Sequence, residues 1–136
     1  MDRLRYLLDT NILSDLIRQP NGRITECLKA VFPATVCTSI VVTSEIYFGL
    51  SKRSSETLRR QAELIMGTLD ILPLEKPADR HYGEIRAELT RRGELIGQND
   101  LLIAAHARSL GLILVTANEK EFSRVPGLVV ENWLAV

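Results

Sequence analysis

Short apolar runs alternate with stretches of helical periodicity along most of the chain. Buried strands are predicted at 6–8, 36–38, 112–115 and 128–130, with a strand-like connector at 70–74. Apolar residues three and four positions apart predict helices at about 11–19, 24–32, 39–50, 58–69, 82–92 and 100–110. Short strands that alternate with helices indicate an α/β sandwich around a mainly parallel sheet. The chain has 136 residues, no repeats and no linker, so a single domain, 1–136, is expected.

Polar side chains follow two of these strands directly. Asp9 comes after the first strand, and the segment 116–121 comes after the strand at 112–115. Parallel α/β sheets form their sites outside the carboxyl ends of the strands, so both groups are expected at one edge of the sheet. Glu45 and Asp100 lie on predicted helices that can cover that edge.

Each of these acids has an ordinary explanation. Asp9 can be a helix cap, as can Thr10 or Asn11 after it. Asp100 can be a partner for the positive end of a helix dipole. Periodicity alone favours an exposed turn position for Glu121. Glu45 is harder to explain in this way, because the stretch 40–48 is so apolar that its helix has almost no polar face.

A metal site accounts for all four acids at once. Four carboxylates brought together repel one another unless a divalent cation neutralises them. Mg²⁺ or Mn²⁺ prefers such oxygen ligands, and these ions mostly handle phosphates. Side chains beside the acids are expected to hold a water or orient a ligand; they are Asn11, Thr116 and Asn118.

Composition narrows the other possibilities. The 17 basic and 17 acidic residues balance, so nucleic acid can be attracted only by a local basic cluster. The clusters that are candidates for RNA phosphates are Arg86, Arg91–Arg92, Lys52–Arg53 and Arg59–Arg60, although any one pair on a helix is usually just solvated. Two cysteines and two histidines match no zinc pattern. No apolar run approaches the roughly 20 residues of a membrane span, and residues 1–8 leave no room for a signal peptide, so a cytoplasmic protein is expected.

Four segments together resemble a known family. The segments 8–11 (LDTN), 44–49 (SEIYFG), 96–107 (IGQNDLLIAAHA) and 115–122 (VTANEKEF) resemble, in order, the four motifs of PIN-domain ribonucleases. The segments 86–89 and 130–133 are also similar to the VapC toxins of bacterial toxin–antitoxin pairs. The similarity covers nearly the whole chain and implies a PIN-like three-layer α/β/α sandwich.

The resemblance implies a role for each acid. Asp9, Glu45 and Asp100 match the catalytic acids that bind the metal. Glu121 stands where the wider family often has Asp, one methylene shorter, so it is expected to bind the metal directly or through a water. Glu119 competes with it for that fourth position.

The resemblance also implies partners. They are Mg²⁺ or Mn²⁺, an RNA substrate such as the anticodon stem-loop of initiator tRNA, a second copy of the chain, and a VapB-type antitoxin in a higher assembly. The antitoxin is expected in an apolar groove near Glu45, where Leu13, Leu16 and Leu50 offer surface. The alternatives are a PIN nuclease in RNA processing, a non-catalytic RNA- or partner-binding scaffold, and a phosphatase with an aspartate nucleophile. The phosphatase is disfavoured because Asn11 stands where its second aspartate is expected.

Overall fold

The predicted strands form one sheet in which every neighbouring pair is parallel. The computed structural model describes residues 4–32 and 34–135. Its strands follow the order β3-β2-β1-β4-β5 across the sheet. They are β1 (Leu4–Leu8), β2 (Thr35–Ser39), β3 (Asp70–Leu72), β4 (Ile113–Val115) and β5 (Val130–Glu131). The predicted parallel α/β sheet is therefore confirmed.

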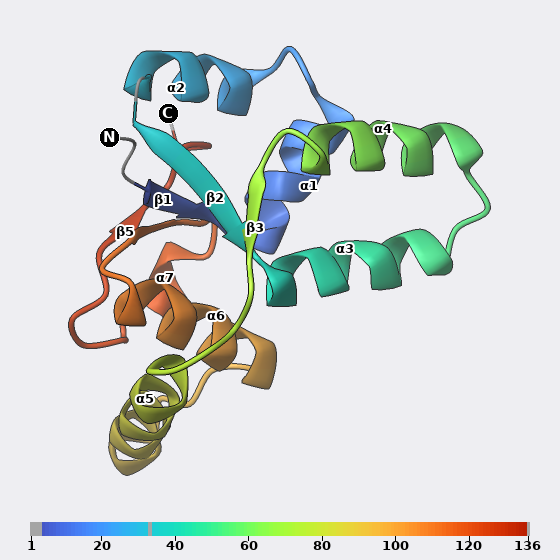
Figure 1. The fold of residues 1–136 in the computed structure, drawn as a ribbon. Coiled ribbons are helices and arrows are strands. Elements are labelled where there is room, and N and C mark those ends of the chain that lie inside the picture. The colour runs from blue at the N-terminus through green and yellow to red at the C-terminus, as the bar shows by residue number, and fades with distance from the viewer. Residues whose placement is uncertain (1–3, 33, 136) are drawn as a thin grey trace.

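Helices cover both faces of this sheet, which completes the predicted α/β/α sandwich. Figure 1 shows α1, α3 and α4 grouped on one side of the strands and α5, α6 and α7 on the other. The helices are α1 (Thr10–Arg18), α2 (Arg23–Val31), α3 (Ile40–Ser51), α4 (Glu56–Met66), α5 (Ala78–Arg92), α6 (Gln98–Ser109) and α7 (Glu119–Phe122). No helix among the described residues is long and apolar enough to cross a membrane.

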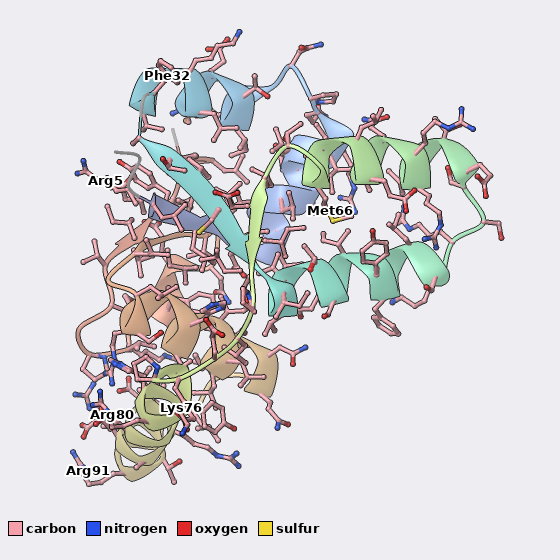
Figure 2. All side chains as sticks on the ribbon, in the orientation of Figure 1. Arg5, Phe32, Met66, Lys76, Arg80 and Arg91 are labelled. Atoms are coloured by element: carbon pink, nitrogen blue, oxygen red, sulfur yellow. The ribbon has the colours of Figure 1, made fainter. Side chains whose placement is uncertain are left out.

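The central strands are buried on both faces, as their uninterrupted apolar sequences indicate. Leu7, Leu8 and Leu114 are fully buried in the sheet. The helices close over them with their apolar stripes: Met66, for example, points from α4 toward α1 (Figure 2) and is also buried. This core holds the ends of the strands in fixed positions.

The register of the strands aligns their carboxyl ends. Leu8 of β1 pairs with Val115 of β4 on one side and with Thr38 of β2 on the other. The next residue of each strand therefore lies at the same edge, and the Asp9 N–H donates to the Val115 carbonyl at 2.9 Å. The predicted common edge for Asp9 and the segment after β4 is confirmed.

Several element boundaries differ from the predicted ones. Of the three candidate caps for α1, Asp9 is the one that caps the helix, so that expectation is confirmed. The fourth helix ends at Met66 and not near residue 69, because Gly67 is its C-cap. The connector at 70–74 contains a true edge strand, β3, which pairs with β2. The turn expected after β4 contains a short helix, α7. Pro33, expected to stop the second helix, lies outside the described residues.

Candidate active site at the carboxyl edge of the sheet

Asp9 is the most rigidly held of the candidate acids. It is 4% exposed at the end of β1. Its Oδ1 accepts the Thr10 N–H at 2.7 Å, and its Oδ2 accepts the Thr116 hydroxyl at 2.6 Å. Burial raises the pKa of Asp9, the two hydrogen bonds oppose this rise, and the charge of Glu45 adds to it. The carboxylate is thus fixed in one orientation by the start of α1 and the end of β4.

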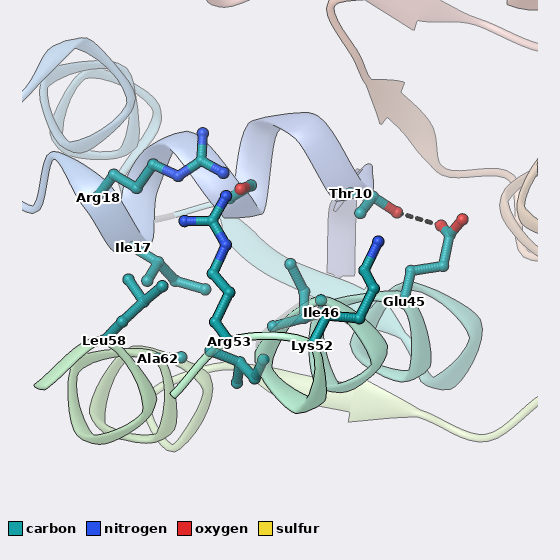
Figure 3. A pocket seen from close by; sticks show the side chains of 12 residues that line it. Thr10, Ile17, Arg18, Glu45, Ile46, Lys52, Arg53, Leu58 and Ala62 are labelled. Atoms are coloured by element: carbon teal, nitrogen blue, oxygen red, sulfur yellow. Dashed lines mark hydrogen bonds between the residues drawn. The ribbon is translucent and has the colours of Figure 1, made fainter. Parts of the chain in front are cut away.

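Glu45 reaches the same edge from the middle of α3. One of its oxygens accepts the Thr10 hydroxyl, as the dashed line in Figure 3 shows. The other accepts the Asn99 side-chain N–H at 3.3 Å. The first turns of α1 and α6 are therefore both joined to Glu45, which explains a carboxylate within so apolar a helix.

Asp100 completes the group from the first turn of α6. Burial raises the pKa of the Asp100 carboxyl to about 6, and the negative charges of three other acids contribute, those of Asp9, Glu45 and Glu121. Burial and nearby like charges both favour the protonated form of a carboxyl group. The other three predicted acids therefore lie close enough to act on Asp100 electrostatically.

Two glutamates, Glu121 and Glu119, are candidates for the fourth acid of the site. Glu121 is half-buried on α7, and its charge contributes to the pKa of Asp100. Glu119 is exposed and accepts a hydrogen bond from the Asn132 side chain at 3.5 Å. The structure thus directs Glu121 toward the other acids and Glu119 toward the C-terminal segment.

Three of the acids share one hollow of about 390 Å³, which we call the acid hollow. It is lined by Asp9, Thr10, Asn11, Ser14, Arg18, Glu45, Asp100 and Asn118. Among residues 4–32 and 34–135, no ion pair involves any of the four acids. The acid hollow thus gathers hard oxygen donors with no ion-paired counter-charge.

This donor set fits a hydrated divalent cation rather than a closed cage of protein ligands. In the part of the chain that the structure describes, no three acids, histidines or cysteines stand at the spacing of a ready-made metal site. Mg²⁺ keeps several of its waters and needs only one or two direct carboxylates. Glu45 is held at the acid hollow by hydrogen bonds from Thr10 and Asn99.

The predicted polar side chains all lie at this edge. Thr116 is buried, and besides donating to Asp9 its hydroxyl accepts the Asn118 N–H at 3.0 Å. Asn11 accepts the Ala117 N–H at 3.3 Å, which ties the start of α1 to the turn before α7. These contacts hold in place the turn before α7, the helix that carries Glu121.

The structure adds residues to which the sequence analysis gave no role at this edge. Thr10 and Asn99 hold Glu45, and Ser14 and Arg18 line the acid hollow. A signal for two of them was present, because Asn11, Ser14 and Arg18 stand at i, i+3 and i+7 and so share one face of α1. The contacts of Thr10 and Asn99 join distant parts of the chain and have no local signal.

Three of the predicted RNA-binding arginines, all on α5, lie apart from the acid hollow. The Arg86 guanidinium donates to the Tyr82 hydroxyl at 2.8 Å. Arg91 and Arg92 both pair with Glu88 on the same helix. Figure 2 shows Arg91 on the outer part of α5, and none of these three arginines lines the acid hollow. Their contact with RNA stays a prediction.

Comparison with known proteins places this arrangement in a family. The PIN domain family matches residues 6–128. The chain is 42% identical over 136 residues to Ribonuclease VapC2 of Haemophilus influenzae, covering 96% of this chain and 99% of that protein. It is 39% identical over 133 residues to the tRNA(fMet)-specific endonuclease VapC of Shigella flexneri, covering 96% and 98%.

Solved structures of VapBC complexes contain chains that are similar to this one over nearly its whole length. The toxin–antitoxin complex VapBC2 of Rickettsia felis, bound to a promoter DNA fragment, contains a chain with a TM-score of 0.91 and 36% identity, over 96% of this chain and 99% of that one. VapBC-1 of nontypeable Haemophilus influenzae gives a TM-score of 0.88 and 32% identity, over 97% and 100%. The chain therefore belongs to the PIN domain family and, within it, to the VapC ribonucleases.

Proposed function

We propose that this protein is a divalent-metal-dependent endoribonuclease, the toxin of a VapB–VapC pair. The observation that carries the proposal is the convergence of Asp9, Glu45 and Asp100 on one hollow, with no ion-paired counter-charge from the residues that the structure describes. Its relatives of 42% and 39% identity bear the names ribonuclease and tRNA(fMet)-specific endonuclease. We therefore assign RNA as the substrate and initiator tRNA as the RNA to test first.

We assign Mg²⁺ or Mn²⁺ to the acid hollow, with Asp9, Glu45 and Asp100 as the residues that would hold it. The chemistry that such a cation supplies when bound is activation of water and neutralisation of charge on a phosphodiester. Glu121 is assigned a contact through water, because it does not line the acid hollow. The cation must be divalent and hard, since the donors are carboxylate oxygens.

The chain's own residues divide the remaining work. The Thr116 hydroxyl donates to Asp9 and so favours its charged, ligating form. Thr10 and Asn99 hold Glu45 at the rim, so its carboxylate needs little reordering when the site fills. Asn11 anchors the backbone beside Ala117, which keeps the loop leading to Glu121 in place. Preorganisation of this kind lowers the cost of stabilising charge that develops during the reaction.

The antitoxin is assigned to a second hollow, which adjoins the acid hollow between α1, α3 and α4. This side hollow of about 190 Å³ has apolar walls that include Ile17, Ile46, Leu50, Leu58 and Ala62. Leu50 was predicted to line the antitoxin groove, and it does line this hollow. The expectation for Leu13 and Leu16 was wrong, because both are buried in the core and neither lines this hollow.

We also propose a homodimer and a higher assembly with the antitoxin; the similarity to chains of VapBC complexes supports the antitoxin partner. We further propose that residues 1–136 form a single domain. We also propose that the protein acts in the cytoplasm, where tRNA is found. A PIN nuclease of RNA processing has the same site, and growth on expression of the chain alone distinguishes the two. Arrest that is relieved by the antitoxin supports the toxin, whereas normal growth with active protein supports RNA processing.

The test is cleavage of labelled initiator tRNA by purified protein, with Mg²⁺ and with excess chelator. Cleavage that requires the cation and disappears in Asp100→Asn supports the proposal. Binding of RNA without cleavage under both conditions would instead support a non-catalytic scaffold. Glu63→Gln, which neutralises an exposed acid on α4, is the matched control and is expected to keep full activity.

A further inference from the structure

Three cations surround the side hollow. Arg18 lies at the end of α1, and Lys52 and Arg53 directly follow α3; all three are exposed and line the hollow. Figure 3 shows the guanidinium groups of Arg18 and Arg53 turned toward one another across the hollow. The Lys52 side chain extends toward Thr10 and Glu45 in the same view. Two separate segments of the fold thus present positive charge to one space.

These charges are not balanced by the protein. Among the described residues, none of the three cations takes part in an ion pair. Within those same residues, Glu45 is the only carboxylate that lines the hollow, and its oxygens accept from Thr10 and Asn99. Lys52 also lies over the Phe48 ring, 4.6 Å from its centroid, which favours this extended position. Facing cations repel one another, so an anion between them is stabilised.

The side hollow continues into the acid hollow. Four residues line both: Thr10, Ser14, Arg18 and Glu45. Positive charge therefore begins where the crowded carboxylates end. A polymer with one negative charge on each repeating unit can place one charge at the cations of the side hollow and the next at the acid hollow.

We propose that Arg18, Lys52 and Arg53 bind backbone phosphates of the RNA that flank the phosphate cut at the carboxylates. This inference rests on the proposed ribonuclease function and gives that function a substrate path along α1 and α3. The antitoxin, assigned to the apolar walls of the same hollow, would then exclude the RNA from it. The inference differs from the expectation for α5, where Arg91 and Arg92 both pair with Glu88 and lie apart from the acid hollow. Guanidinium groups suit the role because they bind phosphate oxygens in pairs.

The experiment measures the affinity for a fluorescently labelled RNA hairpin as a function of salt, in excess chelator so that the RNA stays intact. The variant is Arg18→Gln/Arg53→Gln. The matched control is Arg91→Gln/Arg92→Gln, which removes the same charge from α5. Each lost phosphate contact flattens the slope of log affinity against log salt by roughly 0.7 to 0.9, so the variant is expected to lose about 1.4 to 1.8 and the control nothing. Arg18→Lys/Arg53→Lys is expected to restore most of the slope.

Cleavage with Mg²⁺ provides the second measurement. KM is expected to rise several-fold in Arg18→Gln/Arg53→Gln, and by a larger factor than kcat falls, because the lost contacts bind substrate and transition state alike. Slope and KM that both match wild type, in protein that cuts RNA, overturn the inference and leave the ribonuclease intact. A variant that loses affinity only for an acidic peptide also overturns it, since the cations then serve a protein partner. Wild-type protein that never cuts RNA overturns the proposed function instead, and the slope in chelator still decides the phosphate site.

Discussion

The His106 ring nitrogen Nδ1 lies 2.8 Å from the Ser39 hydroxyl, in a fully enclosed position between α6 and the start of α3. Ser39 caps α3 by accepting the Val41 N–H at 3.0 Å, and the other side of the His106 ring bonds to the Pro73 carbonyl. In the neutral tautomer whose other ring nitrogen donates to the Pro73 carbonyl, His106 Nδ1 accepts the Ser39 hydroxyl hydrogen. This contact joins the helix that carries Asp100 to the helix that carries Glu45.

Replacement of His106 tests the contact through stability. His106→Leu keeps most of the volume but leaves the Ser39 hydroxyl and the Pro73 carbonyl without their partner. The cost of such unpaired buried groups is about 1–3 kcal/mol in the free energy of unfolding. Urea unfolding at pH 8 measures it, and a loss below about 0.5 kcal/mol would show that the contact is unimportant.

The pH dependence of that loss follows from the sign of the His106 pKa shift. Burial lowers the pKa of His106 from its ordinary 6.5, against smaller raising effects of the Pro73 carbonyl and Glu75. The unfolded chain therefore takes up the proton first as pH falls, so the histidine's contribution is complete above pH 6.5 and declines below it. The stability gap between wild type and His106→Leu is expected to narrow between pH 7.5 and 5. A constant gap contradicts this expectation, and Asp100 does not disturb the comparison because it titrates in both proteins.

Asp100→Asn is expected to stabilise the protein in excess chelator. The pKa of Asp100 is raised from 3.8 to about 6, so the folded protein holds this proton more tightly than the unfolded chain. Stability is lost as pH rises through that window, and the penalty is complete above about pH 6. Because the group is partly exposed, relief is on the order of 1 kcal/mol at pH 7.5 and disappears near pH 4. Thermal unfolding at both pH values measures it, and Glu63→Gln should show no such gain.

Thr116→Val tests the effect of the Thr116 hydroxyl on Asp9 while the shape of the site is kept. Valine fills the same space but cannot donate to Asp9 or accept from Asn118. The pKa of Asp9 is expected to rise, so cleavage should begin at higher pH than in wild type, and stability should fall by about 1–3 kcal/mol. Thr116→Ser keeps the hydroxyl and should retain the wild-type pH profile. An unchanged profile in the valine variant would mean that this hydrogen bond does not tune the carboxylate.

The two candidates for the fourth acid give different outcomes. Glu121→Gln is expected to reduce kcat by about tenfold or more, because Glu121 shares the electrostatic environment of Asp100. Glu119→Gln should remain within about twofold of wild type, since Glu119 contacts Asn132 at the surface. Single-turnover cleavage rates compare the two directly. The opposite ranking would assign the fourth position to Glu119.

The sequence predicted which residues lie at the carboxyl edge of the sheet, but it did not predict all of the contacts between them. Asp9 was predictable at that edge because an apolar strand ends directly before it and parallel strands align their ends. Four-residue α7 was missed because it is too short to show a helical period. Leu13 and Leu16 were expected at the surface, but the apolar stripe of α1 that holds them packs on the core. The Thr10 and Asn99 contacts with Glu45 join residues 35 and 54 positions apart, which no local pattern encodes.

The most direct test of the central claim is the rate of RNA cleavage by wild type and Asp9→Asn in Mg²⁺, with wild type in excess chelator as the third arm. Asparagine keeps the shape of Asp9 and its oxygen for the Thr10 N–H but removes the charge. We expect cleavage to fall by a factor of at least about 10² in Asp9→Asn and to vanish for wild type in chelator. In Mg²⁺, wild type and Asp9→Asn are both expected to unfold at a temperature similar to or higher than that of metal-free wild type. Wild-type rates in either the variant or the chelator would contradict the assignment of this carboxylate cluster as the metal-dependent catalytic site.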